Sequence, residues 1–175
     1  MKYDPPKPPT RLESRPSRVG PVDGEVMVNG RRAVLCPSGT KPYEIFIEKI
    51  GFDLEITEVD DKYYLFLPSG SRNAESLLSG IEAYPGEKIA VVKYVFDYMK
   101  SLVNAGLFDP GLGLKNVGVV RQKNTDYFTI PSEYLTSLRD LEDSDIEEWF
   151  KSIYDYLVLL CPDIDTDIRH IFGLR

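Results

Sequence analysis

Residues 87–120 constrain the fold most, because they predict a long helix, a loop and a short strand in that order. Apolar residues recur at steps of three and four, which places them on one helix face and predicts a core position for each: Ile89, Val92, Phe96, Met99 and Val103. Gly106 is typical of a helix end, since glycine adopts the left-handed conformation without strain. A polar loop follows, and Val117, Val119 and Val120 favour a strand. We expect this loop to carry a site.

Two β-hairpins are predicted before this stretch. Asn29-Gly30 lies between two β-favouring runs and fits a type I′ turn, whose positive φ angles suit these two residues. Residues 54–59 alternate with period two, Asp60-Asp61 forms the turn, and residues 63–67 form the return strand. Between the hairpins, residues 42–50 predict a short helix that ends at Gly51. We expect its apolar positions to be buried: Tyr43, Ile45, Phe46, Ile47 and Ile50.

The rest of the chain is mainly helical by the same criteria. Asn73 is a favourable N-cap for a helix from residue 74 to about residue 82, and residues 127–130 predict a strand. Ser144 or Asp143 can cap a long helix with this apolar face: Ile146, Trp149, Phe150, Ile153, Leu157 and Leu160. Residues 164–172 predict a last short helix. The expected fold is therefore α+β: a small β-rich lobe of two hairpins and a short helix, then a mainly helical lobe with a small hairpin.

A chain of 175 residues is long enough for one domain with its own core. We expect a single globular domain over residues 21–175, with a β-rich lobe at 21–70 and a mainly helical lobe at 71–175. Residues 1–20 hold five prolines, five basic and two acidic residues, a net charge of +3, which predicts an extended proline-rich arm. Two interpretations stay open: a disordered tail, or an arm that lies across a partner with an acidic surface.

The formal charge of −7 argues against general nucleic-acid binding, because affinity for phosphates requires clustered lysine and arginine. Cys36 and Cys161 cannot make a disulfide scaffold, so we expect buried thiols in a reducing compartment. The longest apolar run, residues 156–161, is too short to cross a membrane, and the first twenty residues lack the apolar segment of a signal peptide. We therefore expect an intracellular, cytoplasmic protein with no membrane partner; a virion component is the alternative.

The order of these features resembles protein-kinase-like proteins. In that family a long helix leads to a catalytic aspartate, a metal-binding asparagine five residues later and an apolar strand. Aligned without gaps, Asn116 matches the asparagine, Gly111 takes the place of the aspartate, and Asp109 takes the place of the family's histidine. Leu35 or Cys36 stands where the family has its phosphate-binding lysine. The resemblance implies a degenerate, pseudokinase-like member with a compressed kinase-like fold.

The resemblance covers about residues 20–160 and implies two cofactor-binding residues for magnesium–ATP, Asn116 and Asp126, because both supply hard oxygen ligands. The alternative is that Asn116 caps the loop, Asp126 opens a hairpin and no cofactor binds. No catalytic residue is assigned, since Gly111 cannot deprotonate a nucleophile. Asp109 is the nearest carboxylate, but it lies seven residues before Asn116 rather than five.

No metal site is predicted elsewhere. Three aspartates have the spacing that opens a calcium loop: Asp163, Asp165 and Asp167. Ile168 and Leu174 occupy the positions that need glycine and glutamate, so these aspartates are interpreted as helix-capping charges. His170 is the only histidine, which excludes the usual zinc sites.

We expect a non-catalytic, kinase-like module that binds a protein. The chain contains 11 tyrosines, and exposed tyrosines on a rigid frame favour protein contacts. The alternative is a structural or assembly protein, a component of a virion or large complex, whose arm contacts neighbouring subunits. An active phosphotransferase ranks third, because the phosphate-binding lysine and the catalytic aspartate of the family are both replaced.

Overall fold

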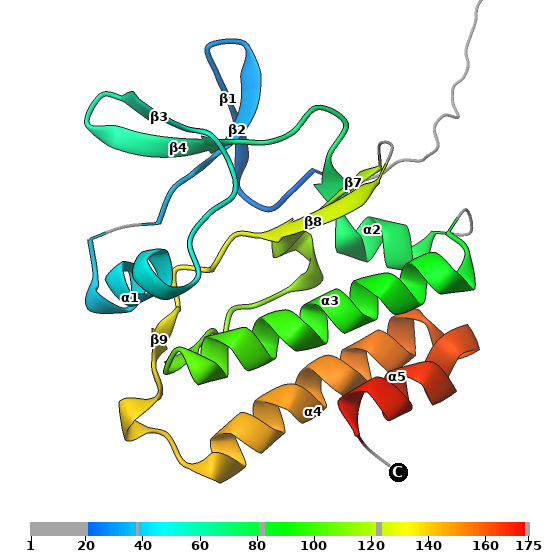
Figure 1. The fold of residues 1–175 in the computed structure, drawn as a ribbon. Coiled ribbons are helices and arrows are strands. Elements are labelled where there is room, and N and C mark those ends of the chain that lie inside the picture. The colour runs from blue at the N-terminus through cyan, green and yellow to red at the C-terminus, as the bar shows by residue number, and fades with distance from the viewer. Residues whose placement is uncertain (1–20, 38, 81–82, 122–123, 174–175) are drawn as a thin grey trace, which may run out of the picture.

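The computed structural model describes residues 21–37, 39–80, 83–121 and 124–173, so the predicted arm at residues 1–20 lies outside the described residues. The chain folds into a β-rich N-terminal lobe and a mainly helical C-terminal lobe (Figure 1). The predicted α+β class, with two hairpins and a short helix before the helical part, is confirmed.

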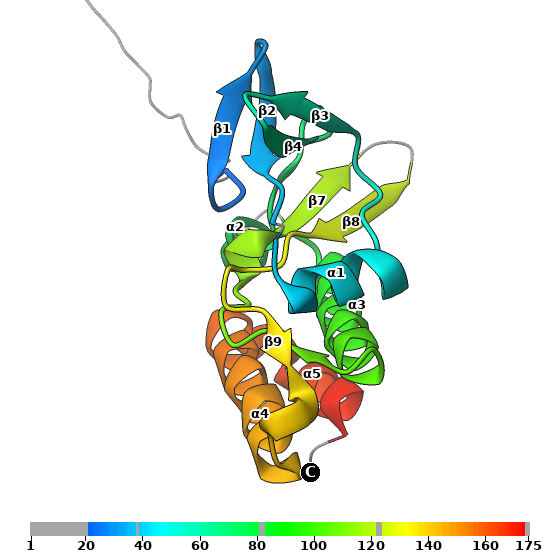
Figure 2. The same cartoon turned by 90° about the vertical axis from the view of Figure 1, so that its left-hand side faces the viewer.

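Two antiparallel hairpins form the sheet of the N-terminal lobe. β1 (Glu25–Val28) pairs with β2 (Arg31–Leu35), and β3 (Ile56–Val59) pairs with β4 (Lys62–Phe66). Pairing of β2 with β4 gives the strand order β1-β2-β4-β3. α1 (Lys41–Lys49) connects the hairpins and lies between the sheet and the helical lobe (Figure 2).

The Asn29-Gly30 turn has the predicted positive φ angles, and the second hairpin turns at the predicted place. Asn29 and Gly30 have φ angles of 53° and 78°. In the second turn, Asp60 and Asp61 have φ angles of 53° and 66°. Glycine, asparagine and aspartate enter this left-handed region more readily than other residues, which explains why the chain reverses at these two places.

Replacing Gly30 with valine is expected to cost on the order of 1 kcal/mol or more, because a β-branched residue would be held at a positive φ. No atom lies within 4 Å of the position of an added Cβ, so the cost is conformational rather than steric. Urea unfolding of Gly30→Val and of the control Gly30→Asn measures it, since asparagine tolerates this conformation. Equal stabilities of the two variants would contradict the turn.

The elements of the C-terminal lobe, in the part of the chain that the structure describes, are the following. The α-helices are α2 (Ala74–Ser79), α3 (Pro85–Asn104), α4 (Asp143–Leu160) and α5 (Asp165–Phe172). One sheet contains β5 (Arg72–Asn73), β7 (Val117–Arg121) and β8 (Thr125–Thr129), and another contains β6 (Leu107–Phe108) and β9 (Thr136–Ser137). The 3₁₀ turns are η2 (Leu114–Asn116), η3 (Leu138–Asp140) and η4 (Pro162–Ile164). β7 and β8 lie between the four-stranded sheet and α3 (Figures 1 and 2).

The predicted core face of α3 is confirmed only in part. Val92 and Met99 are fully buried, whereas Ile89, Phe96 and Val103 are half-buried. The buried set extends to further positions: Val91, Val95, Tyr98 and Leu102. α3 is covered on more than one side, because α5 and β6 both pack against it. The prediction of one apolar helix face therefore included too few of the buried residues of α3.

Three local predictions differ from the structure. Ile47 was expected in the core but is half exposed, because α1 buries only its Tyr43 and Phe46 face. α2 ends at Ser79, since the chain leaves the helical conformation at Gly80. The cap of α4 is Glu142 rather than Asp143 or Ser144; its backbone N–H donates to Asp145 Oδ2 at 3.0 Å.

Apolar side chains join the two lobes. Residues from the sheet and from the β7–β8 hairpin form one buried cluster, which we call the inter-lobe cluster: Val22, Val34, Cys36, Leu65, Leu67, Val120, Phe128 and Ile130. The predicted burial of both thiols is confirmed, and Cys36 and Cys161 are free. Among the described residues, no helix is long and apolar enough to cross a membrane.

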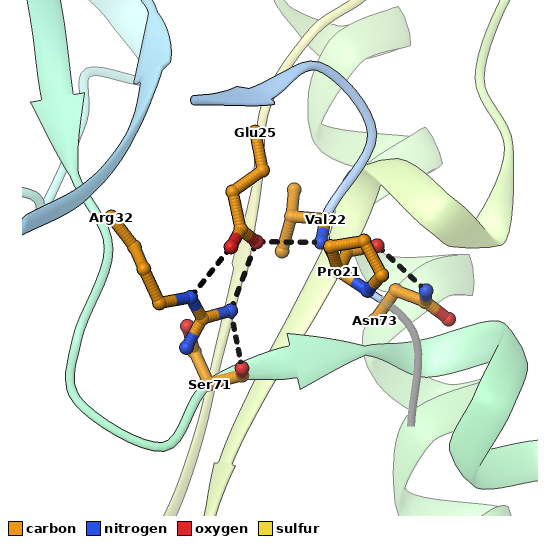
Figure 3. Close-up of polar contacts among 6 residues, drawn as sticks. All are labelled: Pro21, Val22, Glu25, Arg32, Ser71 and Asn73. Carbon is orange, nitrogen blue, oxygen red and sulfur yellow. Dashed lines mark hydrogen bonds and ion pairs between the residues drawn. The ribbon is translucent and has the colours of Figure 1, made fainter. Parts of the chain in front are cut away.

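A partly buried ion pair fixes the sheet to the connection between the lobes (Figure 3). Arg32 Nε donates to Glu25 Oε2 at 2.7 Å, and Arg32 Nη2 donates to Glu25 Oε1 at 2.9 Å and to the Ser71 carbonyl at 2.7 Å. The Val22 N–H also donates to Glu25 Oε1, at 3.1 Å. The Asn73 side chain donates to the Pro21 carbonyl at 2.8 Å. These hydrogen bonds hold Pro21 and Val22, the first described residues, against Glu25 and Asn73.

Glu25→Gln is expected to lower the free energy of unfolding at pH 7 by about 1–2 kcal/mol, because hydrogen bonds between charged groups are lost. The hydrogen bonds from Arg32 hold the pKa of Glu25 below its ordinary value of 4.5. A lowered pKa stabilises the fold above the unfolded pKa, and this contribution is lost as the pH falls through the folded pKa. The difference between wild type and Glu25→Gln should therefore shrink below pH 4.5 in urea titrations.

The matched control is Glu55→Gln, which removes the other glutamate–arginine pair of the sheet. Arg31 Nη1 lies 3.3 Å from Glu55 Oε2, and both side chains are more than half exposed. Exposed pairs contribute little because water and salt screen them. Equal effects of Glu25→Gln and Glu55→Gln at pH 7 would contradict a structural role for the partly buried Glu25–Arg32 pair.

Candidate functional site

A cleft of about 730 Å³ lies between the sheet and the loops of the helical lobe. One wall is formed by the end of β2, the start of β4 and Asp61 of the turn before β4. The opposite wall is formed by Gly111 and Asn116 of the loop before β7 and by the segment that follows β8. The predicted site loop therefore does face a cleft, together with a segment that the sequence places twenty residues further on.

The walls of this cleft carry large apolar side chains in contact with solvent. Leu35 is 50% exposed, Tyr63 is 48% exposed and Tyr134 is 62% exposed. They come from β2, β4 and the segment after β8, so the exposed apolar surface lies on both sides of the cleft. Exposed aromatic side chains that gather in a concave surface indicate a binding site rather than chance exposure.

Asp109 organises the floor beneath the cleft. Its side chain is fully buried, and its carboxylate accepts hydrogen bonds from the Gly111 N–H at 3.1 Å and the Ser132 N–H at 2.8 Å. The Ser132 hydroxyl donates to the same carboxylate, and the Tyr43 hydroxyl donates to the Ser132 carbonyl. Three segments are tied together in this way: α1, the loop after β6 and the segment after β8. Asp109 is thus a structural acceptor whose oxygens are already engaged.

Gly111 is enclosed by the same segment. A Cβ at this position would lie 2.4 Å from Ser132 Oγ and 2.8 Å from Tyr134 Cδ2. No side chain can be accommodated at residue 111 without displacing this wall of the cleft. The floor is therefore built around a residue that offers no acid, base or nucleophile.

Asn116 lines the cleft and also holds its own turn. Its Oδ1 accepts a hydrogen bond from the Gly113 N–H at 3.2 Å, and its carbonyl accepts one from the Ile130 N–H at 3.0 Å. The side-chain bond closes the η2 turn, as the capping interpretation of Asn116 predicts. The side-chain oxygen of Asn116, which would be its metal ligand, therefore already accepts a hydrogen bond within the loop.

Asp126 does not join Asn116 in the cleft. It lies on β8 opposite Val120 and is exposed, whereas Asn116 directly precedes the other end of the hairpin, where Val117 pairs with Thr129. Four residues along a strand correspond to roughly 13 Å. The structure thus places the two predicted cofactor-binding residues at opposite ends of the β7–β8 hairpin. Within the described residues, no group of three or more histidine, cysteine, aspartate or glutamate side chains could hold a metal ion.

The nucleophilic groups around the cleft are not activated. Burial raises the pKa of the Cys36 thiol, which disfavours the thiolate. Burial, with smaller effects of the Asp109 and Glu133 charges, raises the pKa of Tyr43 to about 12. Both groups are therefore protonated at neutral pH, which disfavours a role as nucleophile or base.

Charged side chains surround the cleft with an acidic excess. Asp23, Asp61 and Glu133 line it and are exposed, against one basic residue, Lys62. A concave apolar surface with an acidic edge favours ligands that combine apolar groups with positive charge. Nucleotide phosphates would meet repulsion at this edge.

Sequence reasoning missed the part played by Ser132, Tyr43 and Tyr134. The sequence alone predicts no role in the site for Ser132. Its contacts join segments far apart in the chain, with Tyr43 lying 89 residues away. No local pattern marks such contacts. Comparison of the chain with protein-family models, with curated proteins and with solved structures found no match.

Proposed function

We propose that this chain is a non-catalytic, kinase-like module that binds another protein through the cleft. The proposal rests on one observation: the walls of the cleft expose apolar side chains, whereas the polar groups of its floor are bonded to one another. The walls expose Leu35, Tyr63 and Tyr134, which supports protein binding because aromatic side chains are enriched at such sites. The polar groups of the floor are satisfied by one another, which leaves no free base or nucleophile there.

The kinase-like part of the proposal is supported by the order of the elements. Hairpin, short helix, hairpin, long helix, loop and hairpin follow one another as the family resemblance implies. At the positions that the resemblance assigns to catalysis, Gly111 replaces the aspartate and Leu35 or Cys36 replaces the lysine. The inter-lobe cluster joins the sheet to the β7–β8 hairpin through apolar contacts. All of these features favour a kinase-like module without phosphoryl transfer.

The proposed partner is a protein rather than a nucleic acid. The acidic edge of the cleft and the net charge of −7 oppose phosphate binding. Two free, buried cysteines suit a reducing compartment, so we place the protein and its partner in the cytoplasm. An assembly protein with an arm on neighbouring subunits is the second candidate, and the basic, proline-rich composition of residues 1–20 favours it.

The purified protein is expected to transfer no phosphate from labelled ATP, with magnesium or manganese, to itself or to candidate acceptors. Loss of a phosphate-binding lysine or a catalytic base each removes several orders of magnitude of rate. Thermal unfolding with and without magnesium–ATP should give the same Tm. Phosphate transfer that survives repurification would contradict the proposal. A Tm increase that disappears in Asn116→Ala and Asp126→Ala would instead assign a nucleotide to those two residues.

A further inference from the structure

The cleft has the chemistry of a site for proline-rich, basic peptides. Tyr63 and Tyr134 offer flat aromatic surfaces on opposite walls, and proline rings pack on such surfaces in the known modes of proline-rich recognition. Asp23, Asp61 and Glu133 supply negative charge at the edge for lysine or arginine side chains. Proline-rich segments lose little conformational entropy on binding, which suits an open cleft of this kind.

This chain contains a segment with that composition. Residues 5–11 read Pro-Pro-Lys-Pro-Pro-Thr-Arg, with four prolines and two basic residues and no acidic one. The whole arm has a net charge of +3, whereas the rest of the chain has a net charge of −10. Charge complementarity thus favours contact between the arm and the acidic edge of the cleft.

The described chain starts at Pro21, close in sequence to two residues of the cleft. Asp23 and Gly24 line the cleft two and three residues after Pro21, and the Asp23 N–H donates to the Lys115 carbonyl at 2.8 Å. Residues 12–20 give nine residues of linker, which span up to about 30 Å when extended. A tether of this length gives an effective concentration in the millimolar range, so binding within one molecule prevails over binding between molecules in dilute solution.

We propose that residues 5–11 occupy the cleft of their own chain and compete there with the protein partner. This inference rests on the proposed function, because it names the peptide class that the same site takes. The arm then acts as an internal competitor: a partner binds only after displacing it. Proline-rich, basic segments of a partner are the ligands that the cleft selects.

The test compares three full-length proteins. The first is wild type, the second carries the four substitutions Pro5→Ser, Pro6→Ser, Pro8→Ser and Pro9→Ser, and the third is the matched control Pro16→Ser. The probe is a fluorescein-labelled synthetic peptide with the sequence of residues 1–14, followed by fluorescence anisotropy. With the internal arm weakened, the four-proline variant should bind the probe about tenfold more tightly than wild type or Pro16→Ser, because tethered competition is removed.

Two further substitutions locate the binding surface. Adding Tyr63→Ser and Tyr134→Ser to the four-proline variant should abolish probe binding, whereas adding Tyr84→Ser should not. Tyr84 is 73% exposed and lies at the start of α3, outside the cleft, so it controls for loss of an exposed tyrosine. Circular dichroism of each variant shows whether the fold is retained.

Equal probe affinities of wild type and the four-proline variant would overturn the inference, and so would binding that survives loss of both cleft tyrosines. A dimer in light scattering that the four-proline substitution converts to monomer would overturn binding within one chain and assign the arm to a neighbouring copy. These outcomes are separate from failure of the proposed function, which phosphate transfer from labelled ATP would reveal without any change in probe binding.

Discussion

Asp109→Ala is expected to lower the free energy of unfolding by about 3–5 kcal/mol, because three donors lose a buried charged acceptor. The backbone N–H groups of Gly111 and Ser132 and the Ser132 hydroxyl all donate to this carboxylate. Their contributions do not add fully, since the three bonds share one acceptor group. Urea unfolding followed by circular dichroism measures the loss.

The matched control for this prediction is Asp126→Ala, which removes a carboxylate from an exposed position on β8. Surface substitutions of this kind usually change stability by about 0.5 kcal/mol or less. A loss below about 1 kcal/mol for Asp109→Ala would mean that the floor of the cleft is not held by this residue. If Asp109→Ala destabilises the fold as expected, loss of an activity in this variant would not identify Asp109 as a catalytic base. The loss of folded protein would explain it.

Gly118→Ala is expected to cost about 3 kcal/mol or more, because the added methyl group has no space. Gly118 on β7 faces Phe128 on β8, and a Cβ at residue 118 would lie 2.0 Å from Phe128 Cζ. The Phe128 ring belongs to the inter-lobe cluster, so it cannot move aside without opening the contact between the lobes. Thermal and urea unfolding of the variant measure the cost.

The control for steric cost is Gly86→Ala, at a position in the first turn of α3 where no atom lies within 4 Å of an added Cβ. Alanine is there expected to be neutral or to stabilise the helix by up to about 1 kcal/mol. The double variant Gly118→Ala, Phe128→Leu should be more stable than the sum of the two single effects predicts, since the smaller side chain relieves the overlap. Additive effects would contradict direct contact between the two residues.

Features set by a few neighbouring residues could be predicted from the sequence. Asn29-Gly30 and Asp60-Asp61 specify their turns through local backbone preferences, and the helices appear as periodic patterns. Gly118 could not be interpreted in this way, because its requirement for no side chain comes from a ring on the paired strand. Local backbone preferences therefore determine the turns and helices, whereas packing between distant residues determines the requirement for glycine at residue 118.

The candidate site was predictable only as a loop. The sequence directed attention to Asn116, which does line the cleft, and to Asp126, which lies at the far end of the hairpin. The burial of Asp109 and its bonds to Ser132 depend on how the segments after β6 and β8 meet, which no local pattern records. The kinase-like resemblance and the identity of any cofactor stay predictions.

Site-specific photo-crosslinking tests the central claim most directly. Full-length protein carrying benzoylphenylalanine in place of Tyr134 is irradiated in its native cells, with the same residue in place of Tyr84 as the control. Both positions are exposed, but only Tyr134 lines the cleft. A covalent adduct with a partner protein is expected from position 134 and none from position 84. Adducts from position 84 without any from position 134 would contradict a protein-binding role for the cleft.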